Sequence, residues 1–282
     1  MPEINQVNAD IKNYLDTLNI SIQVSLDGFS FCIYSTEDKN IHAVRHYRFV
    51  QAILQEDIFN ITDEILYKDD LLRLSFKKVR VIYTGRKSTL VPDEFFKNEN
   101  LKSILEFNQP IDELDEIYYN TISGCQSKLV FTVPHYFTNI ITDKFSNAGF
   151  YNQATPLLNY ILSDEEKLQK DQVIVQLNRD FFDLIIVREG RLKLYNTFLF
   201  VNATDLVYFI LYVCKQIKID LKTSPIYILG GLEAHESLMQ EITPYLPSMQ
   251  LFKIPEHFRQ GSVLKKIDID RFFTLLYLSM CE

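Results

Sequence analysis

The spacing of hydrophobic residues is most regular in the second half of the chain. An apolar run predicts a strand over 172–176, and two further strands, 183–188 and 192–198, flank the turn dipeptide Glu189-Gly190. Apolar side chains at helical spacing predict a long helix over 202–219. The remaining pattern predicts a strand at 226–229, a helix at 235–242, a strand at 251–254 and a closing helix at 269–280.

The first half shows a similar order of elements. Its opening apolar stretch, 20–34, is interrupted by the turn dipeptide Asp27-Gly28, which predicts a hairpin. Thr62 is a candidate N-cap for a helix over 63–76, and Gly149 is a candidate C-cap after a helix over 134–145. The pattern also predicts strands at 42–50, 78–83, 115–122 and 128–133, and helical segments at 92–96, 101–107 and 156–162.

Each half thus begins with strands joined by hairpins and continues with alternating helices and strands. A β-β-β-α-β-α order that occurs twice predicts an α/β protein of two related lobes, with any ligand in the cleft between them. The polar segment 165–171 is the candidate junction. It gives an N-terminal lobe at 1–165 and a C-terminal lobe at 166–282.

Composition and charge limit the kinds of partner and the cellular compartment that we expect. The 282 residues are 47% hydrophobic, which is enough for two packed lobes and excludes long disordered stretches. The net charge of −8 argues against a surface that neutralises phosphates, so we do not expect a nucleic-acid partner. The cysteines are scattered, the N-terminal stretch lacks the pattern of a signal peptide, and the apolar runs are shorter than the ~20 residues of a transmembrane helix. We therefore expect a cytoplasmic protein.

The stretch Val173–Gly190 resembles the second phosphate loop of the actin-like ATPase superfamily, which includes actin, the heat-shock chaperone ATPases, the sugar kinases and the pilus-assembly actin homologues. In that superfamily a hydrophobic strand runs into Asp-x-Gly-x-x-Thr and then into a hairpin. The hydrophobic frame and the length agree here, but Gln176 stands in place of Asp and Asn178 in place of Gly. Phe181 and Phe182 lie near the position of the Thr.

Two other segments resemble the remaining loops of this superfamily. The strand and Gly-Gly turn within 226–235 are similar to the adenosine loop, and Val24–Phe31 is similar to the first phosphate loop. Aligning Gly28 on the family glycine places Leu26 on the metal-side aspartate and leaves Asp27 one residue out of step.

Further segments narrow the resemblance. The stretches 84–96 and 131–134 resemble the pilus-assembly and secretion-system members. As a whole, the chain is similar to an uncharacterised bacterial family of unknown function within this superfamily. The resemblance covers most of residues 20–282.

The resemblance implies two ribonuclease-H-like lobes with an inter-lobe cleft, and it implies a last helix, about 269–280, that packs back on the first lobe. The alternative for that helix is that its apolar surface is left for a partner. The candidate cofactor-binding residues carried over from the superfamily are Gly28, Ser30, Asn178, Gly230 and Gly231. Because both carboxylates that would hold Mg²⁺ are replaced, we expect no catalytic residue, no metal site and no resident cofactor. Binding of ATP with Mg²⁺ remains the alternative.

Several residues allow two interpretations. Phe181 and Phe182 either seal the space of the γ-phosphate or pack into the core of the lobe. The Gly230-Gly231 turn either lets an adenine approach the backbone or joins a strand tightly to a helix. Asp183 is expected at the start of a hairpin, and Asp180 is a candidate replacement for a missing acid.

Two histidines are considered as metal ligands. His42 and His46 are four residues apart in a predicted strand, so their side chains are expected on one face. No cysteine or carboxylate with ligand spacing accompanies them, and we do not expect a metal site there.

Three functions remain open from the sequence. The leading hypothesis is a non-catalytic actin-like scaffold, a pseudo-ATPase, that binds a protein partner. The alternative is a nucleotide-binding protein with weak ATPase or kinase activity that uses displaced carboxylates such as Asp27 and Asp180. The third is a pseudo-enzyme subunit that supports an active paralogue.

Overall fold

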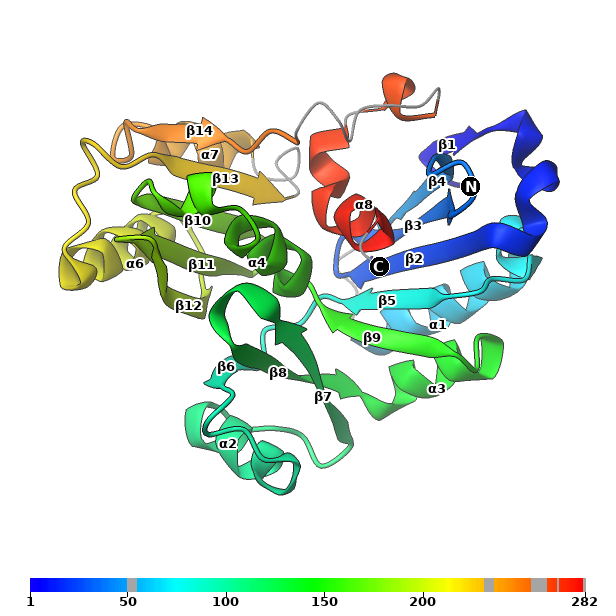
Figure 1. Cartoon of the computed structure of the whole chain (residues 1–282), viewed down its shortest axis with the longest axis horizontal. Helices are drawn as coiled ribbons and strands as arrows, with labels where there is room; N and C mark the ends of the chain where they lie inside the picture. Colours follow the sequence, from blue (N-terminus) through cyan, green and yellow to red (C-terminus); the bar gives the residue numbers. More distant parts are fainter. Residues whose placement is uncertain (50–54, 231–235, 255–262, 268, 281–282) are drawn as a thin grey trace.

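Two sheets of the same strand order form the two halves of the chain (Figure 1). The computed structural model describes residues 1–49, 55–230, 236–254, 263–267 and 269–280. The first sheet has the order β1-β4-β3-β2-β5-β9 and the second the order β12-β11-β10-β13-β14. The edge strand β1 and the small sheet β6-β8-β7 are additions to the first half. Without them, the five strands of each half, counted along the chain, lie in the spatial order 3-2-1-4-5. The predicted α/β fold with two related lobes is confirmed.

The bounds of the elements follow from the backbone. The strands are β1 (Ile4–Val7), β2 (Leu18–Ser25), β3 (Gly28–Ser35), β4 (Ile41–Arg48), β5 (Val79–Tyr83), β6 (Ser88–Pro92), β7 (Asp115–Ile122), β8 (Ser127–Pro134), β9 (Ala148–Asn152), β10 (Gln172–Leu177), β11 (Phe181–Arg188), β12 (Arg191–Leu199), β13 (Ile226–Gly230) and β14 (Met249–Leu251). The α-helices are α1 (Gln55–Lys68), α2 (Leu101–Asn108), α3 (His135–Lys144), α4 (Ala154–Leu162), α5 (Glu165–Leu168), α6 (Ala203–Ile217), α7 (Glu236–Ile242) and α8 (Phe273–Met280).

Alternating side chains give the first sheet two buried faces. On β2, Ile20 and Ile22 join one hydrophobic core with residues of α1 and α3. On β3, Cys32 points to the other face and joins a second core with residues of α4 and α8. The small sheet β6-β8-β7 and α2 form an insertion between β5 and α3, with a core of their own around Leu105.

The second sheet is also covered on both faces. Val173 and Val175 of β10 pack in a core with residues of α6 and α7, whereas Ile174 belongs to the core shared with α4 and α8. The helices α4 and α8 therefore pack between the two sheets, as Figure 1 shows. The boundary between the lobes at 165/166 stays a prediction.

Several predicted elements differ from the structure. The first helix covers Gln55–Lys68, so Thr62 is a buried residue inside it and cannot be an N-cap. Gly149 pairs with Arg80 in the parallel ladder of β9 and β5, and it does not cap a helix. Residues 93–95 form a turn, because Pro92 ends strand β6 instead of opening a helix. The last strand of the second sheet is Met249–Leu251 and not 251–254.

No helix in the described part of the chain is long and apolar enough to span a membrane.

Candidate functional site

A small cavity lies where the two lobes face each other. Its walls come from β2 and β3 of the first lobe, from the ends of β10 and β13 in the second, and from the segment 270–274. Its volume is about 70 Å³. Ligand pockets usually measure roughly 300–1,000 Å³, so this cavity is far too small for a nucleotide.

The segment that precedes and opens α8 occupies the cleft. A 3₁₀ turn at Ile269–Phe272 leads into α8, and Arg271, Phe272 and Phe273 all line the cavity. Arg271 Nη2 donates to His46 Nε2 at 2.7 Å, and Thr274 Oγ1 donates to Gln23 Oε1 at 3.0 Å. Phe272 and Phe273 are buried in the core shared by the two lobes. The chain's own C-terminal segment therefore occupies the space beside the small cavity.

His46 connects this segment to a predicted site residue. Because Arg271 donates to Nε2, the imidazole proton sits on Nδ1, which donates to Ser30 Oγ at 2.8 Å. Burial lowers the pKa of His46 to about 3, and the positive charges of Arg271 and Arg48 act in the same direction. His46 is therefore neutral over the physiological range.

The structure brings three of the five predicted cofactor-binding residues together. Ser30, Asn178 and Gly230 line the small cavity. Gly28 does not line it: it pairs with Arg48 at the start of β3, and a β-carbon there would overlap the backbone oxygen of Tyr47. Gly231 lies outside the described residues.

Gln176 and Leu26 stand at the positions where the resemblance to the superfamily places aspartates. Gln176 is buried and donates from Nε2 to the backbone oxygen of Gln153 at 3.3 Å. Leu26 packs against the core of the first lobe. Neither position supplies a carboxylate for a metal ion.

The two phenylalanines have different surroundings. Phe182 packs in the core under α6, stacked on Phe198 at 5.5 Å between ring centroids. Phe181 lines a second cavity of about 260 Å³, together with Asp180 and Leu26. The core interpretation therefore holds for Phe182. The cleft is filled by the segment before α8 rather than by these two rings.

A buried polar cluster joins the lobes beside the cleft. Asp183 is fully buried, and its Oδ2 accepts from Gln153 Nε2 at 2.9 Å. Its Oδ1 accepts from Thr197 Oγ1 at 2.6 Å and from Tyr195 OH at 3.3 Å. Tyr195 OH is also 2.8 Å from Ser88 Oγ. We call Ser88, Gln153, Asp183, Tyr195 and Thr197 the Asp183 cluster.

Burial dominates the electrostatics of this cluster. It raises the pKa of Asp183 to about 6, against the effect of the hydrogen bonds from Thr197, Gln153, Tyr195 and Asn178. Burial and the neighbouring Asp183 charge hold the pKa of Tyr195 well above its usual range. The sequence pattern predicts Asp183 only as a hairpin start and does not indicate this role, because its partner Gln153 is 30 residues away.

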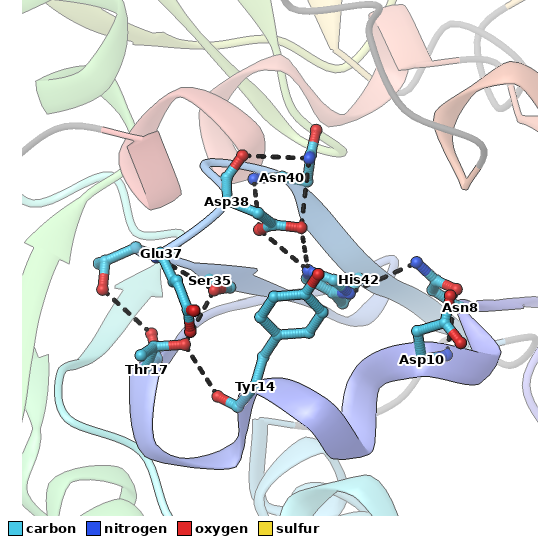
Figure 2. Close-up of polar contacts among 10 residues, drawn as sticks. Asn8, Asp10, Tyr14, Thr17, Ser35, Glu37, Asp38, Asn40 and His42 are labelled. Carbon is cyan, nitrogen blue, oxygen red and sulfur yellow. Dashed lines mark hydrogen bonds and ion pairs between the residues drawn. The ribbon is translucent and has the colours of Figure 1, made fainter.

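The predicted histidine pair is divided between two separate groups. His42 Nε2 lies 3.0 Å from Asp38 Oδ2, and its ring packs 4.5 Å from that of Tyr14, as Figure 2 shows. His46 instead contacts Ser30 and Arg271. Four residues along an extended strand place the Cα atoms of the two histidines about 13 Å apart. Among the described residues, no group of three or more His, Cys, Asp or Glu side chains is arranged to hold a metal ion.

The paired sheets, the helices between them and the inter-lobe cleft define the class: the chain has the actin-like ATPase fold. It belongs to the family described as "Protein of unknown function (DUF3822)", whose model matches residues 8–249. No curated protein sequence matches the chain.

Solved structures agree with the fold. A Bacteroides thetaiotaomicron VPI-5482 protein of actin-like ATPase fold and unknown function is 22% identical over 97% of this chain and 99% of its own, with a TM-score of 0.80. A PilM-PilN type IV pilus biogenesis complex matches 94% of this chain and 99% of the other at 11% identity, with a TM-score of 0.56. The predicted likeness to pilus-assembly actin homologues is confirmed at the level of the fold.

Proposed function

We propose that this chain is a non-catalytic, actin-like scaffold that binds a protein partner. The observation that carries the proposal is the inter-lobe cavity of about 70 Å³, which the chain's own Arg271, Phe272 and Phe273 help to line. In this fold class a ligand between the lobes needs several times that volume. Nucleotide binding would require this cavity to open, whereas a scaffold role requires no such change.

The chemistry of the cleft supports the same proposal. Phosphoryl transfer requires carboxylates that hold Mg²⁺ and place the attacking group. Gln176 and Leu26 supply none, and the buried Asp183 accepts hydrogen bonds from Gln153, Thr197 and Tyr195. A carboxylate engaged in this way is a poor replacement for a metal ligand.

The protein partner and the compartment belong to the proposal as well. The similar fold in a PilM-PilN complex supports a role in protein binding. The described cysteines Cys32, Cys125 and Cys214 are unpaired, which fits a reducing compartment such as the cytoplasm.

The weak-ATPase alternative receives less support from the geometry. It requires Asp27 and Asp180 to share one metal ion. Asp27 lines the small cavity beside Asn178, whereas Asp180 lines the separate 260 Å³ cavity.

Calorimetry with ATP and Mg²⁺, together with a phosphate-release assay, tests the proposed function. We expect no binding heat at sub-millimolar nucleotide and no turnover above background. A double variant, Arg271→Ala with Thr274→Ala, enlarges the cavity and serves as the control, since heat in that variant alone would indicate that the C-terminal segment excludes the nucleotide. Turnover by the unaltered protein that Gln176→Ala abolishes would contradict the proposal.

A further inference from the structure

The Asp183 cluster crosses from one lobe to the other. Ser88 of β6 and Gln153, which precedes α4, come from the first half of the chain. Asp183 of β11 and Tyr195 of β12 come from the second sheet. The bonds from Gln153 to Asp183 and between Ser88 and Tyr195 therefore join the two halves directly.

Gln153 is held in place on the side of the first lobe. Its Nε2 donates to the backbone oxygen of Gly85 at 3.0 Å, and its Oε1 accepts from the Gly85 amide at 3.2 Å. Its backbone oxygen accepts from Gln176 Nε2 of the second sheet. A separation of the lobes would break the bonds that Gln153 makes to Asp183 and Gln176.

The cluster can accommodate a proton on Asp183. Hydroxyl groups donate and accept hydrogen bonds, so either Thr197 or Tyr195 can accept the one proton of a neutral carboxyl group while the other still donates to it. Gln153 still donates to the other oxygen. The neutral acid therefore keeps every partner and avoids the cost of a buried charge.

We propose that the Asp183 cluster is a proton-controlled clasp between the lobes, tightest when the Asp183 carboxyl group is protonated. The clasp joins the lobes through the chain's own side chains, with no ligand in the cleft.

The charged groups around the cluster bond to other residues or line the larger cavity. Lys87, next to Ser88, bonds to the carboxylates of Asp112 and Asp115. Arg179, in the turn between β10 and β11, donates to the backbone oxygen of Leu26. Arg86 and Asp180 lie around the larger cavity. Among the hydrogen bonds and ion pairs described for this region, none joins a Lys or Arg side chain to Asp183.

The direction of the pH effect follows from proton linkage. In the unfolded chain the lobes are apart, Asp183 is hydrated and its pKa is about 3.9. With the lobes together its pKa is about 6, so the joined state binds the proton more tightly. The stabilisation of the joined state is therefore complete below about pH 4 and is lost as the pH rises through 6. These two values predict that Asp183 makes the equilibrium constant for unfolding rise about tenfold between pH 5 and pH 7.5.

Urea denaturation at pH 5 and pH 7.5 tests the clasp, because in the unfolded chain the lobes are apart and Asp183 is hydrated. The unfolding equilibrium constant of the unaltered protein, divided by that of Asp183→Asn, should rise about tenfold between pH 5 and pH 7.5. Asp183→Asn is the control, since every other titrating group is the same in both proteins.

Further variants test the parts of the cluster. Gln153→Ala removes the bond to Asp183 that crosses between the lobes and should raise the unfolding constant at both pH values. Thr197→Val removes one donor to the carboxylate, so the transition should move to higher pH. A ratio of the unaltered protein to Asp183→Asn that does not change with pH would overturn the proposal.

Discussion

Gly230 is required by the packing of two neighbouring strands. It ends β13 with a φ of 117°, a backbone conformation that side-chain-bearing residues rarely adopt. A β-carbon at this position would overlap the backbone oxygen of Leu177 on the neighbouring strand β10. Strand packing alone therefore requires glycine here, and no nucleotide is needed to explain it.

Gly190 provides a matched control for this argument. Its φ of 71° is also positive, but a β-carbon added in this hairpin turn would meet nothing within 4 Å. We expect Gly230→Ala to lower the free energy of unfolding by about 3 kcal/mol or more, because backbone strain and a steric clash add. Gly190→Ala should cost about 1 kcal/mol. Urea denaturation measures both; equal costs would show that strand packing does not require Gly230.

At the scale of elements, α8 packs on several parts of the chain. It packs against α4 and against strands β2 and β3, and the turn before it contacts β13. Its first residue, Phe273, lies 5.1 Å from the ring of Tyr160 and 4.9 Å from that of Phe252. The aromatic side chains of α4, α8 and the segment after β14 thus form one packed group.

Removal of one aromatic ring from this group should lower the stability of the folded chain. Phe273 is 1% exposed, so Phe273→Ala should lower the free energy of unfolding by roughly 3–5 kcal/mol. Tyr208 of α6 is 56% exposed, and Tyr208→Ala should change it by no more than about 0.5 kcal/mol. Thermal denaturation of the two variants checks the difference. A small loss in Phe273→Ala would mean that α8 contributes little to the core.

The elements also show what a single sequence predicts well. The pattern predicts the hairpin β11–β12 and helix α6 closely, because strand alternation, a Glu-Gly turn and apolar residues at helical spacing are local signals. It does not predict strands β1 and β9, since four or five residues of mixed polarity have no clear period. The filled cleft and the Asp183 cluster depend on contacts such as Arg271 with His46, which are 225 residues apart. No local pattern predicts such a pairing.

At the scale of the molecule, one hydrophobic core includes residues of both sheets. Val44 of β4, Ile174 of β10 and Leu276 of α8 belong to the same buried group. The lobes are therefore joined by apolar packing as well as by the Asp183 cluster. A shared core of this kind favours a single cooperative transition.

We expect the two lobes to unfold together in urea. Hydrogen exchange at increasing urea should show the same midpoint for peptides from β2–β4 and from β10–β12, because their common core is lost in one step. Phe273→Ala weakens that core and should move the two midpoints apart. Two separate midpoints in the unaltered protein would show that the lobes are stable independently.

The position of α8 also affects the order in which the protein is made. The Cys32 thiol on β3 donates to the backbone oxygen of Leu275, a residue 243 positions later in the chain. A ribosome that adds about 5–20 residues per second needs roughly 12–50 seconds to cover that distance. During this time the inner face of the first sheet has no helix α8 to cover it. The newly made N-terminal lobe therefore offers an apolar surface to chaperones until synthesis reaches the residues that complete it.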